Sequence, residues 1–489
     1  MKKTLELIKK NRLKKLKSLQ NQGFNCFPSL TKRTYKISQI LKNFSRLSFQ
    51  KKEFSIVGRI LGWRTHGGVI FLDLKDETGK IQLLFKKNKL GEKFFNFFEQ
   101  YFDLGDFIQG VGTLIKTKAG EKSLEIINFK ILTKTLRPLP EKWHGLQDIE
   151  ERYRKRYLDL IFNPEVKKAF EFRFKIIKLL REFLNKKDFL EVETPILQPL
   201  YGGASARPFK THFNALDMEL YLRISPELYL KRLLIGGFEK IYEIGKCFRN
   251  EGIDRLHNPE FSSLEIYWAY VNYKEMMKLV EQLFVWLLKK LFAKTSLKYK
   301  GKEINFKTPW QRIDFFQFFK QNLKIDYEKI NQESLLKKAN ELGLKMDPKN
   351  SKAKIADEIF KKVLASKIWQ PTFILHYPLG FQPLAKTFDK NSQKLANFQL
   401  IVGGVELING FSELNDPLEQ KRRFEEQEEL AKKGLEEVQR LDEEFLEALE
   451  YGMPPTGGLG LGIDRLILFL TNFHSLREII LFPTMRIKK

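Results

Sequence analysis

The chain has 489 residues, 43% of them hydrophobic, which is enough to form two or three globular domains with separate cores. Its 87 lysines and arginines outweigh 60 acidic residues, and the formal charge of +27 favours a polyanionic partner such as nucleic acid, although AT-rich codons would produce the same abundance of lysine. Two cysteines are too few for a disulfide framework or a thiolate zinc site, and no run of about twenty apolar residues occurs, so we expect a cytoplasmic protein without a membrane segment.

Residues 3–20 form the first recognisable element. Apolar side chains recur there at roughly helical spacing, with lysines on the opposite side, at Leu5, Ile8, Leu13 and Leu16. The pattern predicts a basic amphipathic helix within an N-terminal extension over residues 1–52. Such a helix suits either a phosphate backbone or the capping of the next domain.

Residues 53–136 change to short alternating segments. Five predicted strands, with a helix at 92–101 between the third and the fourth, follow the order of an OB-fold barrel. One face of such a barrel binds single-stranded nucleic acid by stacking unpaired bases on aromatic side chains. The candidates for base contacts are Arg64, Phe71, Gln82 and Glu121, and the structural alternative for Phe71 is a place in the barrel core.

A stretch with two prolines and no periodicity predicts that residues 137–150 form a linker to a larger domain over residues 151–489. That domain starts with a long amphipathic helix, after which Thr194-Pro195 limits the next strand to an edge of a sheet, where a partner subunit can pair. A lysine-rich helical segment at about 325–370 is expected to be an insertion.

The segment 241–270 predicts two strands joined by a polar loop. Because side chains alternate along a strand, its polar residues are expected in rows that share one face. They are Arg249 and Glu251 on the first strand, His257 and Asn258 in the loop, and Phe261, Glu265 and Tyr267 on the second strand. A guanidinium, a basic loop and an aromatic ring beside carboxylates suit a nucleotide bound together with a cationic group. The alternative is a surface hairpin whose charges are solvated.

Glu227 stands at a predicted helix start. Ser225 precedes it as the expected N-cap, and Pro226 occupies the expected first helical position. The carboxylate of Glu227 therefore either caps the helix or binds an amino group.

Residues 397–417 predict a strand with four candidates, Glu406, Asn409, Phe411 and Glu413. The last three share strand parity and Glu406 does not, so a bulge near residues 403–404 or 408–409 is required if all four point at one site. The acidic segment that follows, to residue 450, predicts helices with a solvated face.

Residues 457–470 predict a glycine-rich strand that breaks into a helix at about Ile463. Arg465 then falls in the first helical turn, where the helix dipole disfavours a cation, so it needs a nearby anion. Glycines let the backbone approach a ligand closely, but glycine-rich turns before helices are also common without a ligand.

Three stretches in this order, residues 186–197, the hairpin with its Phe248-Arg249-Asn250-Glu251 segment, and residues 458–470, resemble motifs 1, 2 and 3 of class II aminoacyl-tRNA synthetases. With the barrel in front, the chain resembles the subgroup that charges aspartate, asparagine or lysine, and GGASARPF, RISPELYLKRL and FSELND resemble the lysyl-tRNA synthetases in particular. The resemblance implies an α+β fold, with an N-terminal OB-fold barrel followed by a catalytic domain whose six-stranded antiparallel sheet is flanked by helices. It also implies a homodimer formed through the first motif, with ATP, L-lysine and tRNA(Lys) as partners.

By this resemblance, lysine is bound by Gly203, Glu227, Arg249, Glu265, Tyr267, Asn409, Phe411, Glu413 and Gly462. Gly203 and Glu227 are implied for the α-amino group, Arg249 and Asn409 for the α-carboxylate, and Glu265, Tyr267 and Glu413 for the ε-ammonium. A separate charge argument agrees, because a pocket for aspartate should offer surplus arginine or lysine, whereas several buried carboxylates require a cationic ligand.

The ATP-binding residues implied are Arg249, Glu251, His257, Asn258, Phe261, Glu406 and Arg465, of which Arg249 and Arg465 are the catalytic residues. A carboxylate is already a nucleophile, so its attack on the α-phosphate needs orientation and charge neutralisation rather than a general base. Magnesium is implied as the cofactor and Glu406 as a ligand. The family's second metal-binding glutamate is Gln399 here, which predicts weaker metal binding at that site. In the barrel, Arg64, Phe71, Gln82 and Glu121 match anticodon-contacting positions.

Three other functions share parts of this pattern. They are a sister enzyme that charges aspartate or asparagine, an elongation-factor lysyltransferase, and a catalytically silent RNA-binding paralogue. The barrel argues against the lysyltransferase. Arg249, Arg465 and Glu406 argue against the silent paralogue, whereas Gln399 leaves it open.

Overall fold

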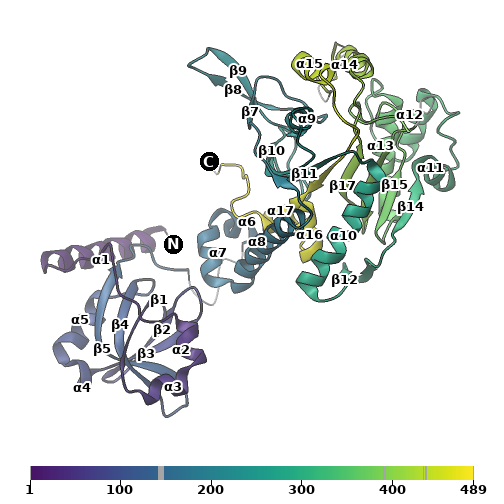
Figure 1. Ribbon diagram of the computed structural model, residues 1–489. Coiled ribbons are helices and arrows are strands. Elements are labelled where there is room, and N and C mark those ends of the chain that lie inside the picture. The colour runs from purple at the N-terminus through teal and green to yellow at the C-terminus, as the bar shows by residue number, and fades with distance from the viewer. Residues whose placement is uncertain (1, 141–147, 389–392, 433, 436–437, 488–489) are drawn as a thin grey trace. The chain divides into compact units, whose positions relative to one another are not determined.

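The computed structural model describes residues 2–140, 148–388, 393–432, 434–435 and 438–487 (Figure 1). The chain forms two compact units, residues 1–147 and residues 148–489. The linker expected at 137–150 spans the change from one unit to the other, and its residues 141–147 lie outside the described part of the chain. Within the described ranges, none of the helices combines the length and the apolar character that a membrane crossing requires.

The first unit contains a closed barrel with the strand order β1-β2-β3-β5-β4. Its strands are β1 (Glu53–His66), β2 (Val69–Lys75), β3 (Lys80–Lys86), β4 (Phe107–Lys116) and β5 (Lys122–Thr133). Its helices are α1 (Lys2–Asn21), α2 (Ile37–Lys42), α3 (Phe44–Phe49), α4 (Lys87–Leu90) and α5 (Glu92–Tyr101). The helix α5 has the bounds predicted from the sequence and packs Phe95 and Phe98 into the barrel core.

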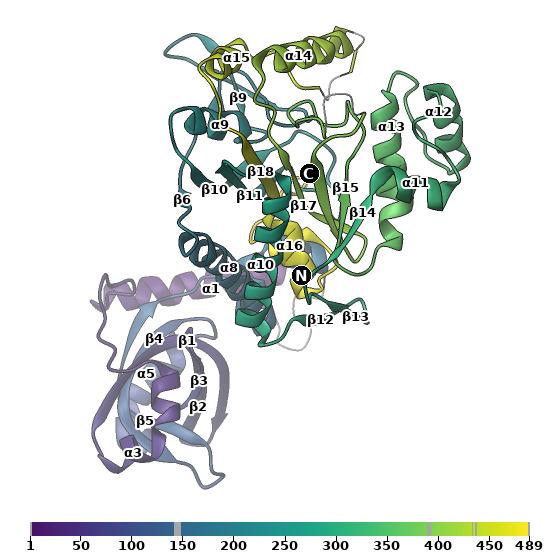
Figure 2. The same ribbon diagram turned by 45° about the vertical axis from the view of Figure 1, so that its right-hand side comes forward.

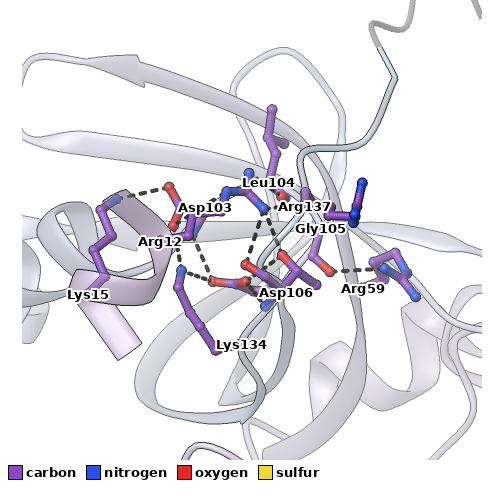
Figure 3. A network of polar contacts seen from close by, with 10 residues as sticks. Arg12, Lys15, Arg59, Asp103, Leu104, Gly105, Asp106, Lys134 and Arg137 are labelled. Atoms are coloured by element: carbon purple, nitrogen blue, oxygen red, sulfur yellow. Dashed lines mark hydrogen bonds and ion pairs between the residues drawn. The ribbon is translucent and has the colours of Figure 1, made fainter. Parts of the chain in front are cut away.

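The helix α1 belongs to the barrel unit, which supports the capping alternative for the N-terminal extension. Its buried residues are Arg12, Leu16 and Leu19, whereas Leu13 is 39% exposed, so the predicted apolar face was wrong at Leu13. The buried face of α1 includes Arg12 in place of Leu13, because the Arg12 side chain enters a polar network at the barrel end (Figure 3). Its guanidinium donates to the Thr135 hydroxyl at 2.8 Å and to the Leu104 carbonyl at 3.0 Å.

A buried ion pair lies at the centre of the same network. The Lys134 ammonium, which is 0% exposed, lies 2.5 Å from an Asp103 oxygen and 2.6 Å from an Asp106 oxygen (Figure 3). Lys15 of α1 reaches Asp103 from the surface at 2.9 Å. Charged side chains therefore hold α1 against the ends of β4 and β5.

The second unit is built on one large sheet with the strand order β14-β15-β16-β17-β18-β11-β10-β6. The bounds are β14 (Gln311–Asp314), β15 (Thr372–Leu375), β16 (Asn397–Val402), β17 (Val405–Ser412), β18 (Thr456–Gly462), β11 (Glu260–Ala269), β10 (Lys240–Phe248) and β6 (Leu190–Glu191). The six strands from β15 to β10 are antiparallel neighbours, as the resemblance implied. Two edge strands add to them in parallel pairing, β14 beside β15 and β6 beside β10.

Helices cover both faces of this sheet (Figures 1 and 2). The main apolar core packs α8 (Pro164–Asn185), α10 (Tyr273–Phe292) and α16 (Ile463–Thr471) against it. A second cluster packs α9 (Glu227–Ile235), α14 (Pro417–Lys432) and α15 (Glu443–Glu450) around side chains of β10, β11 and β17. The remaining elements are α6 (Ile149–Arg154), α7 (Arg156–Phe162), α17 (Leu476–Ile479), β7 (Leu197–Gln198), β8 (Phe209–Phe213), β9 (Met218–Leu222), β12 (Ser296–Tyr299) and β13 (Lys302–Asn305).

The expected insertion at 325–370 is helical and packs beside β14 and β15. It contains α12 (Gln332–Glu341), α13 (Lys352–Ile359), a π-helical turn (Phe360–Leu364) and a 3₁₀ turn (Ala365–Lys367), and it follows α11 (Phe315–Leu323). Its core includes Phe315, Ile355 and Phe360. The insertion therefore packs with α11 and with side chains of β15 and β16 in one apolar cluster.

Candidate active site

A cavity of about 920 Å³ lies over the central strands of the large sheet. All the residues that the sequence assigned to lysine, ATP or metal line this cavity. They are Gly203, Glu227, Arg249, Glu251, His257, Asn258, Phe261, Glu265, Tyr267, Gln399, Glu406, Asn409, Phe411, Glu413, Gly462 and Arg465. The four barrel candidates lie in the other unit and are described separately below.

One end of the cavity is anionic, and Glu265 of β11 lies at its centre. The Ser225 hydroxyl donates to one Glu265 oxygen at 2.9 Å, and the Tyr267 hydroxyl donates to the other at 3.0 Å. Burial, together with the smaller effect of the nearby charge of Glu227, raises the pKa of Glu265 to about 7. A cation placed here would favour the ionised form of Glu265.

The helix start at Ser225 differs by one position from the prediction. The helix α9 begins at Glu227 with Pro226 as its N-cap, and the Ser225 hydroxyl accepts the Glu227 N–H at 3.1 Å. The serine thus sits one residue earlier than an ordinary cap, where its hydroxyl also reaches Glu265. Glu227 does not cap the helix; its carboxylate points to a cation instead.

That cation is Lys231, one helical turn further along α9. Its ammonium lies 2.6 Å from a Glu227 oxygen and 2.5 Å from a Glu413 oxygen, and 5.5 Å from the centre of the Phe411 ring. Lys231 is 0% exposed and Glu413 is 1% exposed. Burial raises the pKa of Glu413 well above its ordinary value, and Lys231 partly opposes that increase. Sequence reasoning missed Lys231, although its spacing of four residues from Glu227 was a usable signal.

Two glycines make room for these carboxylates. A side-chain carbon on Gly458 of β18 would lie 2.0 Å from an oxygen of Glu413 and 2.7 Å from the Tyr267 ring. Gly203 has φ of +82° and donates its N–H to the Gln439 side chain at 2.8 Å. Gln439 is buried and lines the cavity. The acidic composition of the segment before residue 450 predicted a solvated face, and that prediction is wrong at Gln439.

Arg249 lies at the other end of the cavity. The strand β10 ends at Phe248, so Arg249 and Glu251 lie beyond it, and the alternation expected from a strand does not apply to them. The Arg249 backbone N–H donates to the Pro259 carbonyl at 2.8 Å, and its guanidinium lies 5.1 Å from the centre of the Phe261 ring. Its Nε is buried without a hydrogen-bond partner among the described residues, as is the side-chain oxygen of Asn409. Such orphaned buried atoms indicate a site built for a polar ligand.

Arg465 enters the cavity from the first turn of α16, which begins at the predicted Ile463. Its guanidinium lies 3.1 Å from His257 Nε2 and 4.0 Å from a Glu406 oxygen. The preceding Asp464 accepts from Arg173 at 2.5 Å and from the Ser262 N–H at 2.9 Å, which fixes the helix start against β11. A buried ion pair thus holds the catalytic candidate Arg465 in position.

The predicted bulge is present in β17. On the neighbouring strand β16, Leu400 pairs with Ile408 and the next residue, Ile401, pairs with Glu406. Leu407 therefore has no partner on β16 and is the extra residue of the bulge. It lies just before the predicted position at Ile408 and brings Glu406 to the cavity together with Asn409.

Glu406 and Gln399 differ in their fitness for a metal ion. The Glu406 carboxylate is partly exposed, with Arg465 no closer than 4.0 Å, and can share a cation with phosphate oxygens. Gln399 is 2% exposed, and its amide oxygen already accepts a hydrogen bond from the Tyr377 hydroxyl at 2.6 Å. Over the described ranges, no group of three or more His, Cys, Asp or Glu side chains is placed to hold a metal. The residues therefore fit an ion that takes most of its ligands from the nucleotide.

Three barrel candidates lie on neighbouring strands, Arg64 on β1, Phe71 on β2 and Gln82, which is buried, on β3, whereas Glu121 lies just before β5. Arg64 of β1 pairs directly with Phe71 of β2. The neighbours of Phe71 in the strand, Ile70 and Leu72, face the barrel core, whereas Phe71 is half-buried and points the other way, so the core alternative for Phe71 is wrong. Gln82 of β3 accepts a hydrogen bond from the Ser123 hydroxyl at 2.9 Å. Glu121 is exposed in the turn two residues before Ser123.

Known proteins resemble this chain along its whole length. Residues 148–486 match the family of class II tRNA synthetases (D, K and N), and residues 54–132 match the OB-fold nucleic acid binding domain. The lysine–tRNA ligase of Carboxydothermus hydrogenoformans is 47% identical over 98% of this chain and 98% of its own length. That of Clostridium novyi is 47% identical over 98% and 94%, and that of Thermotoga maritima 44% identical over 99% and 97%. The chain therefore belongs to the class II tRNA synthetases of the aspartate, lysine and asparagine group and, within it, to the lysine–tRNA ligases.

Proposed function

We propose that this protein activates L-lysine with ATP and transfers it to the 3′ end of tRNA(Lys). The observation that carries the proposal is the polarity of the cavity: Glu227, Glu265 and Glu413 cluster around Ser225, Tyr267 and Lys231, whereas Arg249 lies beside Phe261 and Arg465 beside His257. A lysine substrate has two ammonium groups and one carboxylate, and this cavity offers partners for both kinds of charge. An aspartate substrate would bring a second carboxylate against buried glutamates, which is unfavourable.

The residues support a division of labour along the substrate. Glu227 and the Gly203 backbone would bind the α-amino group, and Glu265, Tyr267 and Glu413 the ε-ammonium. Phe411 and Gly462 line the same pocket. The orphaned groups of Arg249 and Asn409 would bind the α-carboxylate.

The nucleotide would occupy the other part of the cavity. Adenine would stack between Phe261 and Arg465, with Glu251 and Asn258 contacting the nucleotide and His257 the outer phosphates. A lysine carboxylate oxygen would attack the α-phosphorus in line, forming lysyl-adenylate as the bond to pyrophosphate breaks. Arg249 would join the carboxylate to the α-phosphate. The terminal ribose hydroxyl of tRNA would then attack the lysyl carbonyl carbon, and AMP would leave.

Magnesium would be held by Glu406 together with ATP oxygens, and it would supply positive charge beside the phosphates. Gln399 supports only a weaker second site, because its oxygen is engaged by Tyr377.

Three further parts of the proposal concern partners and surroundings. The face with Arg64, Phe71, Gln82 and Glu121 would contact the anticodon of tRNA(Lys). A homodimer would form beside the edge strand β6, where Leu190, at 51%, is exposed. The two cysteines are free and buried, which supports a reducing, cytoplasmic location.

The test is exchange of labelled pyrophosphate into ATP with each amino acid offered in turn. Exchange that depends on lysine, and not on aspartate or asparagine, is the expected result. Exchange with aspartate would favour the sister enzyme. The absence of exchange with any amino acid would favour a silent RNA-binding paralogue.

A further inference from the structure

Lys231 is a buried cation to which neither the sequence motifs nor the proposed substrate contacts give a role. It lies one turn after Glu227 on α9, and its ammonium is within 2.6 Å of both Glu227 and Glu413. The centre of the Phe411 ring lies 5.5 Å from the same ammonium. The ammonium therefore joins a carboxylate of the helix to a carboxylate of the sheet.

The position of Lys231 relative to the cavity decides how it can act. Glu227, Glu265 and Glu413 line the cavity, whereas Lys231 is not among the described residues that do so and is 0% exposed. The ammonium thus lies behind the carboxylates, on the helix side. A substrate ammonium can approach them from the front while Lys231 stays in place.

The charges of the pocket match the substrate only if Lys231 is counted. The titratable groups around the ammonium are Glu227 on its own helix, Glu413 after β17, and Glu265 and Tyr267 on β11. When a bound cation favours the ionised form of all three carboxyls, three carboxylates and one ammonium leave two net negative charges. The two ammonium groups of L-lysine balance that charge, whereas without Lys231 one buried carboxylate would remain unpaired or take up a proton.

We infer that Lys231 is a positioning residue that supports Glu227 and Glu413 from behind and favours their binding to the two ammonium groups of lysine. The inference rests on the proposed function. It assigns Lys231 to amino-acid selection and not to the nucleotide. It also explains why a lysine-binding pocket contains a lysine of its own.

The experiment compares Lys231→Met with the intact enzyme in lysine-dependent pyrophosphate exchange from pH 6 to pH 9, at saturating ATP. Removing a cation within bonding distance raises the pKa of both carboxyls, so the rise of kcat/KM for lysine should move to higher pH by about one unit or more. The KM for ATP should stay unchanged. Lys231→Arg keeps the charge and should keep the original profile.

The matched control is Arg232→Met, which removes a cation from the next position of α9. Arg232 pairs at 3.2 Å with Asp442, which does not line the cavity, so this profile should not move. If Lys231→Met does not fold, the double variant Lys231→Met with Glu227→Gln removes one buried charge of each sign. Glu413 has still lost its cation in that variant, so the pH profile of kcat/KM for lysine should again move to higher pH.

A folded Lys231→Met enzyme whose pH profile coincides with that of the intact enzyme would overturn the inference, whatever its KM. The proposed function would be untouched by that result. An intact enzyme without lysine-dependent exchange would instead refute the function itself.

Discussion

Gly458 gives the sharpest test of the lysine pocket, because a single methyl group would collide with it. In Gly458→Ala the added carbon would lie 2.0 Å from a Glu413 oxygen, and ordinary contact begins at 3.4 Å, so the carboxylate must retreat by roughly 1.4 Å. The carbon meets Oε1 of Glu413, whose Oε2 lies 2.5 Å from the Lys231 ammonium, and because the side chain is only 1% exposed, a shift of the carboxylate also disturbs that contact.

The size of the expected increase in the KM for lysine follows from the loss of the hydrogen bond between the Glu413 carboxylate and the substrate ammonium. A hydrogen bond to a charged group contributes about 1.5–3 kcal/mol, which corresponds to an increase of about 10- to 150-fold in the KM for lysine. Pyrophosphate exchange at varied lysine and ATP measures this, and the KM for ATP should change much less. Thermal unfolding shows whether the variant is folded.

Gly460→Ala is the matched control. Gly460 lies two residues further on the same face of β18, and a carbon added there meets only a Glu265 methylene, at 4.0 Å. It should leave the KM for lysine within about twofold, because a contact at that distance costs little. Equal losses in both variants, or an unchanged KM in Gly458→Ala, would refute the assignment of Glu413 to the substrate.

Three other perturbations test the barrel, the metal site and the polar network. Phe71→Ala should weaken tRNA binding by about 1–3 kcal/mol, seen as a higher KM for tRNA in aminoacylation, and leave pyrophosphate exchange unchanged; a lower exchange rate would count against a purely anticodon role. Gln399→Glu should lower the magnesium concentration at half-maximal exchange several-fold, since a carboxylate attracts the ion more strongly than an amide; an unchanged titration would show that Gln399 does not limit metal binding. Lys134→Met should destabilise the barrel by about 3–5 kcal/mol, because it leaves the buried Asp106 without its cation at 2.6 Å, whereas Lys15→Met should cost about 1 kcal/mol or less. Denaturant unfolding of the full chain distinguishes these two variants, and similar losses would contradict the network in Figure 3.

Local patterns in the sequence predicted much of this protein, because they depend on neighbours along the chain. Alternating apolar residues gave the barrel strands, and the predicted bounds of α5 and the start of α16 at Ile463 agree with the structure. Strand parity required a bulge near Glu406, and one is present at Leu407. Motif resemblance then assigned roles that periodicity alone left open.

Other features depend on which surfaces meet, and no local pattern contains that information. The exposure of Leu13 follows from the pairing of Arg12 with residues more than ninety positions away. Gln439 is buried although its segment is acidic, because the loop folds back onto Gly203.

The resemblance of residues 186–197, 248–251 and 458–470 to known motifs was enough to predict the family of this chain, which spacing alone left open. Tertiary structure alone decided the state of those carboxylates, since burial and the approach of Lys231 to Glu227 and Glu413 come from packing α9 against β17 and β11. The physical reason is that a charge in a protein interior is governed by its distances to other charges and to water, and folding sets both.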